Sequence, residues 1–194
     1  MTCRGSSRLS RPVRRLAFVI SGVLLVAGLS ACGQKSHPTT ADSEGIYVYA
    51  GPVTYQVQIS RELNPSSLED RTYLSGVSAP APKPDELWFA IFLWAKNTTH
   101  ADQTTTSRFD IIDTQGNRYY PLPINSQVNP FAWTPHTLAP KDTQPLPGST
   151  AFFGPTQGEE LLFKLNDSIY SNRPLTLEIY AAGQSQPSTV SLDL

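Results

Sequence analysis

The sequence predicts an all-β protein built as one antiparallel sandwich or barrel. The first reason is an unbroken apolar run at residues 87–95, which is short and rich in side chains that favour strands. The second is a series of short segments in which apolar and polar residues alternate between turn residues. The third is the presence of 17 prolines along 194 residues, which disfavours long helices. We expect about eight strands, as in other sandwiches and barrels.

The apolar run lies within residues 85–97 and is predicted to be the central strand. Successive side chains of a strand point to opposite faces. One face would carry Leu87, Phe89, Ile91, Leu93 and Ala95, and the other Trp88, Ala90, Phe92, Trp94 and Lys96. Because both faces are largely apolar, this strand should lie in the middle of a sheet and be covered, at least partly, on both sides. Phe89 and Ile91 are expected to face the core between two sheets.

Residues 1–31 are predicted to be a cleaved signal peptide, because five arginines between positions 4 and 15 precede an apolar stretch at 16–29. The next residues, Leu29-Ser30-Ala31-Cys32, resemble the lipobox of bacterial lipoproteins. The resemblance implies that Cys32 becomes the N-terminus and carries diacylglycerol, which anchors the protein on the extracytoplasmic face of the cell membrane. The alternative is an ordinary signal peptide that ends in a chance cysteine.

The exported part divides into a polar, flexible tether at residues 32–45 and a single β-sandwich domain at 46–194. Beyond residue 31 the chain has 10 Lys and Arg against 16 Asp and Glu, a net charge of −6. Without a basic cluster, it is a poor candidate for nucleic-acid binding or for electrostatic binding to anionic lipid. With Cys3 removed and Cys32 lipidated, the domain would fold without disulfides.

The remaining elements follow from alternation and turn residues. Asn64 and Pro65 predict the start of a helix of one or two turns that ends at Gly76. Besides the central strand, we predict strands at 46–49, 53–60, 109–112, 118–122, 149–153, 160–165, 175–180 and 188–194. Residues 125–147 contain five prolines and form the least regular segment, which could hide a short strand.

Several of these segments resemble telokin-like, immunoglobulin-like domains of bacterial surface lipoproteins, a family of unknown function. The similarity rests on the apolar strand that ends in Lys96-Asn97, the hairpin pattern from Phe109 to Tyr119, and Pro147-Gly148 ahead of the apolar Leu161-Leu162-Phe163. It covers roughly residues 50–180 and departs in the proline-rich insertion before Gly148. The resemblance implies an immunoglobulin-like β-sandwich at the cell envelope and supplies no catalytic residues.

No motif predicts chemistry. His37, His100 and His136 are far apart, and the exported chain lacks the cysteine and methionine of a blue-copper site. Asp110, Asp113 and Gly116 could suggest a calcium loop, but a hairpin turn is the better interpretation. The neighbouring carboxylates Asp85-Glu86 and Glu159-Glu160 are interpreted as solvated charges, because adjacent strand residues point to opposite faces. We therefore expect no catalytic residue, no metal and no cofactor.

The candidate binding surface consists of aromatic and histidine side chains in and near the proline-rich segment: Tyr120, Phe131, Trp133 and His136. Exposed aromatic side chains can stack on sugars or anchor a protein partner; the alternative is that Phe131 and Trp133 fold back onto the sandwich. The sequence thus favours a non-enzymatic, lipid-anchored envelope module that binds a protein or a glycan. A structural envelope-assembly domain is the second hypothesis, and a small envelope hydrolase is the third.

Overall fold

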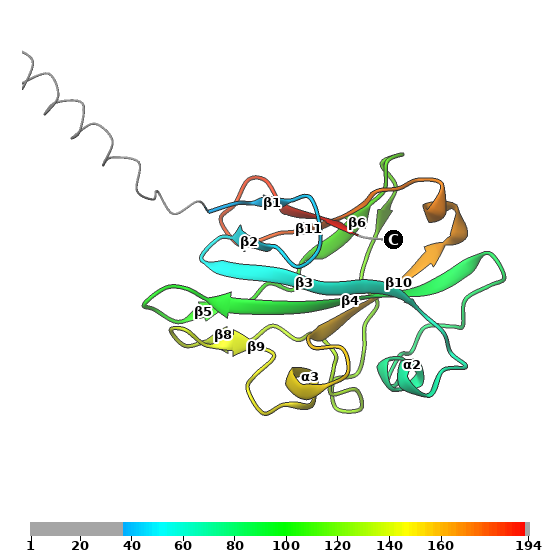
Figure 1. The fold of residues 1–194 in the computed structure, drawn as a ribbon, viewed down its shortest axis with the longest axis horizontal. Coiled ribbons are helices and arrows are strands. Elements are labelled where there is room, and N and C mark those ends of the chain that lie inside the picture. Colours follow the sequence, from blue (N-terminus) through cyan, green and yellow to red (C-terminus); the bar gives the residue numbers. More distant parts are fainter. Residues whose placement is uncertain (1–36, 193–194) are drawn as a thin grey trace, which may run out of the picture. The chain divides into compact units, whose positions relative to one another are not determined.

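The structure, a computed structural model, describes residues 37–192. The predicted signal peptide and Cys32 lie outside the described residues. Two sheets face each other across a shared core, with β3 and β4 crossing the middle of Figure 1 and β1, β6 and β11 on one side of them. The described helices are short: α2 (Leu68–Tyr73), α3 (Thr150–Phe153) and a 3₁₀ turn, η2 (Asp167–Tyr170). The predicted all-β sandwich is confirmed.

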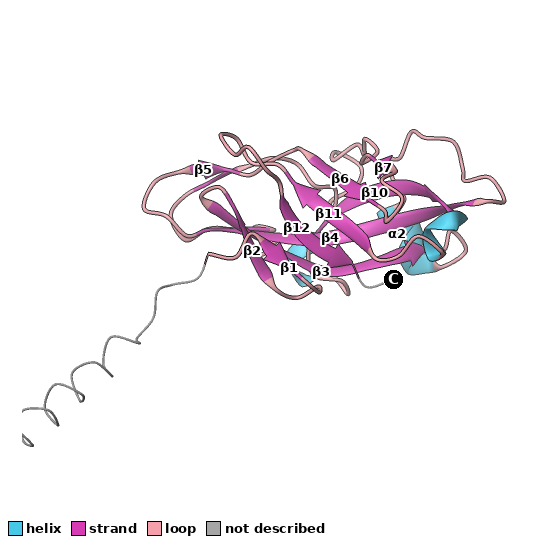
Figure 2. Ribbon diagram, turned by 90° about the horizontal axis from the view of Figure 1, so that it is seen from above, coloured by secondary structure: helices cyan, strands magenta, loops and turns pink. Residues whose placement is uncertain are grey.

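The first sheet, called sheet A, is seen from above in Figure 2. Its strand order is β1 (Thr40–Ala41), β12 (Ser188–Leu192), β11 (Leu175–Ile179), β6 (Phe109–Ile112) and β7 (Arg118–Tyr119). All neighbours are antiparallel except β1 and β12, which run parallel. Along β11, Leu175, Leu177 and Ile179 are buried while Thr176 and Glu178 face outward, as alternation requires.

The second sheet, called sheet B, contains the predicted central strand. Its order is β10 (Glu159–Asn166), β4 (Glu86–Asn97), β3 (Val53–Leu63) and β2 (Tyr47–Ala50), with β9 (Thr143–Gln144) also paired to β4. β4 therefore has long partners on both edges and lies in the middle of the sheet, as predicted. A small third sheet pairs β5 (Gln103–Thr104) with β8 (Thr137–Leu138).

The core between the sheets contains the β4 face that was predicted to point there. Phe89 and Ile91 are almost completely buried, and they belong to a cluster that reaches from Val48 to Leu192. The outward face of β4 is also covered: Trp88 and Phe92 lie in a second cluster with Tyr73 of α2, Phe131 and Leu162. In Figure 1, α2 and α3 lie on this outer side of sheet B, so the molecule has a thin third layer.

The folded chain begins earlier than the predicted boundary at residue 46. Thr40 and Ala41 form β1 against β12, and Ala41 is buried in the core. Further contacts hold the same segment, since the Tyr49 amide donates to the Pro38 carbonyl and the Glu44 carboxylate accepts from Ser60. The polar composition of residues 37–45 concealed these backbone pairings, which need no apolar side chains.

Two other local predictions were wrong. Residues 149–153 form helix α3 rather than a strand, because the Ser149 hydroxyl caps the helix by accepting from the Phe152 amide. Helix α2 begins three residues later than predicted, since Ser67 is its N-cap and Asn64 instead forms a turn that accepts from the Ser66 amide.

Candidate functional site

A concave surface of the molecule is organised around residues 105–108, an extended segment that joins β5 to β6. It is held by hydrogen bonds to groups from distant elements. The Thr106 amide donates to the Tyr55 hydroxyl at 2.8 Å, the Thr106 hydroxyl donates to the Tyr180 carbonyl at 2.6 Å, and the Trp133 indole donates to the Thr106 carbonyl at 2.9 Å. The segment is therefore fixed in place, and Ser107 remains exposed at its centre.

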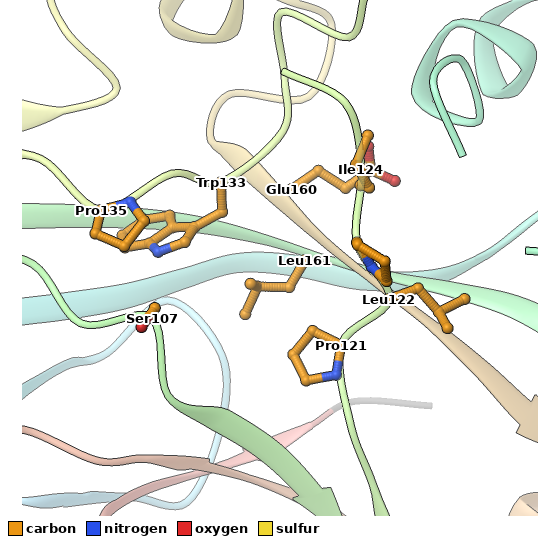
Figure 3. A pocket seen from close by; sticks show the side chains of 9 residues that line it. Ser107, Pro121, Leu122, Ile124, Trp133, Pro135, Glu160 and Leu161 are labelled. Atoms are coloured by element: carbon orange, nitrogen blue, oxygen red, sulfur yellow. The ribbon is translucent and has the colours of Figure 1, made fainter. Parts of the chain in front are cut away.

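Three hollows with volumes of about 180, 540 and 500 Å³ share Ser107 in their linings, and together they are called the Ser107 groove. The smallest is shown in Figure 3, with Trp133 and Pro135 on one side, Pro121, Leu122 and Ile124 on the other, and Leu161 between them. The second hollow extends along residues 103–108 toward Pro52 and Ala182. The third opens over sheet A beside Tyr120 and Arg118.

The third hollow has a polar wall on the outer face of sheet A. The Arg118 guanidinium donates to Asp110 at 2.7 Å, to Glu178, and to the Tyr180 hydroxyl at 3.1 Å, and the Tyr180 hydroxyl in turn donates to Glu178 at 2.6 Å. Asp110 lies on β6, Arg118 on β7 and Glu178 on β11, and Tyr180 directly follows β11. The order β11-β6-β7 in sheet A brings the four side chains together. The cluster therefore contains one guanidinium against two carboxylates.

Burial and neighbouring charges shift the pKa values of the cluster. Burial raises the pKa of Asp110, while the pKa of Glu178 is lowered because hydrogen bonds from Tyr180 and Arg118 outweigh its burial. Burial and the adjacent Glu178 raise the pKa of Tyr180 to about 12, so its hydroxyl keeps its proton at neutral pH. The wall therefore offers both hydrogen-bond donors and acceptors over a wide pH range.

The rim of the groove is aromatic and cationic. The Arg108 guanidinium lies 5.2 Å from the centre of the Tyr180 ring, a distance at which a cation–π interaction is favourable. Tyr120 is 65% exposed, so its ring is available to a ligand. Ser107, Arg108 and Tyr180 each line both of the two larger hollows, so a single ligand could contact both.

Of the four residues predicted as a binding surface, Tyr120 and Trp133 line the groove. Trp133 is half-buried: its ring packs against Tyr55 and Phe109 while one side lines the smallest hollow. His136 is half-buried behind Pro135, where its ring nitrogen contacts the Thr134 carbonyl and its backbone amide donates to the Thr105 hydroxyl. Tyr120 and Trp133 are therefore available to a ligand in the groove.

Phe131 is wrongly placed in the predicted binding surface. Only 6% of it is exposed, and its ring lies edge-on to Tyr73 at 4.8 Å. The backbone around it extends the edge of β10, because the Glu160 amide donates to the Phe131 carbonyl and the Trp133 amide donates to the Glu160 carbonyl at 2.9 Å. The segment 129–133 therefore acts as a strap that covers the outer face of sheet B.

The interpretation of Glu159 and Glu160 as solvated charges was also wrong, because both side chains are buried. The Glu159 carboxylate accepts a hydrogen bond from the Gln144 side-chain amide. Burial raises the pKa of Glu159, and the hydrogen bond from Gln144 and the nearby His136 oppose this shift only in part. Burial raises the pKa of Glu160 to about 8, with Asn129 as a long hydrogen-bond donor at 3.4 Å. The alternation rule placed them on opposite faces correctly, but it could not foresee that the strap and β9 would cover both.

The hairpin interpretation of residues 110–116 agrees with the structure. The Asp113 carboxylate accepts hydrogen bonds from Asn117, Gln115 and Asn172, and although burial acts to raise its pKa, these bonds lower it to about 2. Both carboxylate oxygens are thus occupied. Among residues 37–192, no group of three or more His, Cys, Asp or Glu side chains could hold a metal ion.

Within the same residues, no helix is both long and apolar enough to cross a membrane. Neither His136 nor Glu159 lines any of the three hollows of the groove. The cleft that would have favoured the hydrolase hypothesis, with a histidine beside a carboxylate, is therefore not formed by this pair.

No protein-family model matches the sequence, and no curated protein matches it either. Among solved structures, the chain is similar to the YjhA protein of Bacillus subtilis, with 13% identity and a TM-score of 0.47 over 78% of this chain and 99% of that one. It is also similar to YcdA of Bacillus subtilis subsp. subtilis str. 168, described as a putative lipoprotein, with 11% identity and a TM-score of 0.47. That match covers 76% of this chain and 38% of YcdA.

A third similar structure is an uncharacterised β-sandwich protein of Clostridium difficile 630, with 11% identity and a TM-score of 0.42. It covers 83% of this chain and 99% of that one. The chain is an all-β sandwich. The finer resemblance to telokin-like domains stays a prediction.

Proposed function

We propose that this protein is a non-enzymatic binding module, anchored through Cys32 to the extracytoplasmic face of the cell membrane, and that the Ser107 groove holds a glycan of the cell envelope. The anchor is supported by the lipobox at residues 29–32. The observation that carries the binding proposal is the Ser107 groove itself, in which hollows of about 540 and 500 Å³ meet at one exposed, rigidly held segment.

The polar groups of the groove favour a ligand that both donates and accepts hydrogen bonds. Arg108 and Arg118 supply donors, the Asp110 carboxylate supplies acceptor oxygens, and the Ser107 hydroxyl can do either. Because Arg108 and Arg118 together balance the two carboxylates Asp110 and Glu178, the groove lacks the excess charge that strong binding of an anion or a cation would need. Sugar hydroxyl groups match this mixture.

The aromatic groups of the rim favour the same ligand. Tyr120 exposes its ring beside the third hollow, and Tyr180 lines both larger hollows. Aromatic rings pack against the apolar faces of sugar rings and supply large contact area with little loss of side-chain entropy. Pro121 and Pro135 stiffen the walls, so less ordering is required on binding.

The proposal can be tested with soluble fragments of envelope glycans and the protein lacking residues 1–32. Trp133 lines the groove and is half-buried, so its fluorescence should report ligand binding. Tyr120→Ala and Arg108→Ala should each weaken binding about tenfold, equivalent to ~1.4 kcal/mol. Tyr47→Ala is the matched control, because Tyr47 is a similarly exposed tyrosine on sheet B, away from the groove.

Equal loss of binding in Tyr120→Ala and in the Tyr47→Ala control would contradict the assignment of the groove. Binding of an envelope protein with no glycan response, weakened by the same groove variants, would keep the groove and replace the glycan by a protein ligand. Turnover of a glycan fragment by the wild-type protein would show that it is an enzyme.

A further inference from the structure

We propose that the outer face of sheet B rests on the bilayer through an aromatic band, defined as Tyr47, Ile59, Trp94, Phe152 and Phe153. The inference rests on the proposed anchoring through Cys32 and goes beyond the proposed function, because it assigns a second contact surface. Its occupant is the interface of the membrane that carries the anchor.

The first argument is the short distance between the anchor and the folded unit. The folded unit begins at His37, whose ring lies 4.3 Å from that of Tyr49, and the Tyr49 amide donates to the Pro38 carbonyl at 2.7 Å. Five residue steps separate Cys32 from His37. At no more than ~3.6 Å per residue they span at most about 18 Å. A domain of this size has a radius of gyration of roughly 15 Å, so part of its surface must stay close to the bilayer.

The second argument is the position of the aromatic band relative to His37. Tyr47 lies on the same outward face of β2 as Tyr49, about 7 Å along the strand. It pairs with Gln56 of β3, which pairs with Trp94 of β4, so Trp94 lies about 10 Å across the sheet from Tyr47. Phe152 then packs against Trp94 at 5.2 Å and against Phe153 at 5.0 Å. The band thus runs from the beginning of the folded unit across sheet B to α3.

The third argument is composition. Three large apolar side chains of the band are exposed to solvent: Phe153 is 73% exposed, Tyr47 is 47% exposed, and Ile59, which pairs with Phe92 on β4, is 39% exposed. The exposed Lys96 follows Trp94 on the outward face of β4. Tyrosine and lysine are among the residues that anchor proteins at the membrane–water interface, where one end of the side chain is apolar and the other is wet. The indole nitrogen of Trp94 is buried, so Trp94 contributes to the band by packing against Phe152.

The contact should depend on apolar burial rather than on lipid charge, because the exported chain is acidic overall. It would also set the orientation of the domain. The wall formed by Asp110, Arg118 and Glu178 is on the outer face of sheet A, the opposite side of the sandwich. With sheet B on the bilayer, that part of the Ser107 groove would face away from the membrane and toward ligands of the envelope.

The test uses the full-length lipoprotein, processed in cells and reconstituted into vesicles of phosphatidylethanolamine and phosphatidylglycerol. The sequence contains only Cys3 and Cys32, so a thiol introduced by Phe153→Cys is the one reactive thiol once the signal peptide is removed and Cys32 is acylated. An environment-sensitive fluorophore at this position should shift to the blue and be quenched by spin-labelled lipid. The matched position is Tyr120→Cys, also exposed but on the other side of the sandwich, and its fluorophore should stay accessible to a water-soluble quencher.

A fluorophore at position 153 that is as accessible to the water-soluble quencher as one at 120, in protein that floats with the vesicles, would overturn the membrane contact and leave the anchor intact. Labelling of Cys32, or loss of flotation, would instead show that the anchoring proposal has failed. If the fluorophore at position 153 is protected from the water-soluble quencher without lipid, and if this protection rises with protein concentration, the band contacts a second copy of the chain instead. Quenching of the position-153 fluorophore by spin-labelled lipid should persist at high salt, because salt screens charge interactions and leaves apolar contact in place.

Discussion

Replacing Glu160 by glutamine should make the domain more stable at pH 8 and remove much of its pH dependence. Glu160 is 1% exposed beneath the strap, and burial raises its pKa from an ordinary value of 4.5 to about 8. The folded protein therefore keeps the carboxyl proton until about pH 8, whereas the unfolded chain loses it above about pH 4.5. Above about pH 4.5, the chain must therefore take up a proton when it folds, and this lowers the stability of the folded state as the pH rises.

The size of the effect follows from the two pKa values. The contribution of this carboxyl to stability is fully present below about pH 4.5 and falls by up to ~1.4 kcal/mol for each pH unit until about pH 8, after which it is constant. Glutamine has nearly the same shape as the protonated acid and no charge. Its carbonyl can still accept from Asn129, and Oε1 of Glu160 makes no hydrogen bond that the change would remove. Because buried sites relax, we expect a gain of about 2–4 kcal/mol at pH 8.

The measurement is urea unfolding, followed by tryptophan fluorescence, between pH 4.5 and 8.5, on the protein lacking residues 1–32. The wild-type and Glu160→Gln proteins should differ by less than ~1 kcal/mol near pH 4.5 and diverge steadily above it. Asp102→Asn is the control, since Asp102 is an exposed carboxylate in the loop before β5. Parallel stability profiles for wild type and Glu160→Gln, or a variant that is less stable at pH 8, would refute the reasoning.

The remaining predictions concern the anchor, the core and the strap. Cys32→Ser should abolish acylation; unchanged membrane fractionation and precursor cleavage would remove the lipoprotein hypothesis. Phe89→Ala should lower the free energy of unfolding by ~3–5 kcal/mol, because Phe89 is 1% exposed in the core between the sheets; a loss under about 1 kcal/mol would contradict that placement. Phe131→Ala should cost ~3 kcal/mol or more without affecting ligand capture directly, whereas Trp133→Ala should cost about 2 kcal/mol and also weaken capture. If Phe131→Ala and Trp133→Ala lose the same stability and both still bind the ligand fully, Trp133 does not contribute to binding in the groove.

Where the sequence succeeded, the deciding interactions were local. The apolar run at 87–95 identified the central strand and both of its buried faces, because side-chain alternation depends only on backbone geometry. The hairpin at Asp113 was also predictable, since its carboxylate caps amides two and four residues ahead. Of the residues that the sequence proposed as a binding surface, the structure places Tyr120 and Trp133 in the lining of the Ser107 groove, and their role in binding stays a prediction.

Where the sequence failed, the outcome depended on segments far apart in the chain. Phe131 is covered because the strap pairs with β10, thirty residues away, and the same pairing buries Glu160. The composition of residues 125–147 suggested a projecting loop, since five prolines remove amide donors. The non-proline amides of the strap nevertheless found partners, which made burial favourable.

By itself, the sequence determined the fold class and the central strand, because alternation and turn chemistry are read within a few consecutive residues. Its processing motif likewise predicts a location at the membrane, which stays a prediction. Only the tertiary structure decided where a ligand could be held. The Ser107 groove requires Tyr55, Trp133 and Tyr180, from three distant segments, to fix one extended stretch of backbone. Hydrogen bonds of this kind leave no periodic trace in the sequence, since each depends on a pairing that exists only after the sheets have formed.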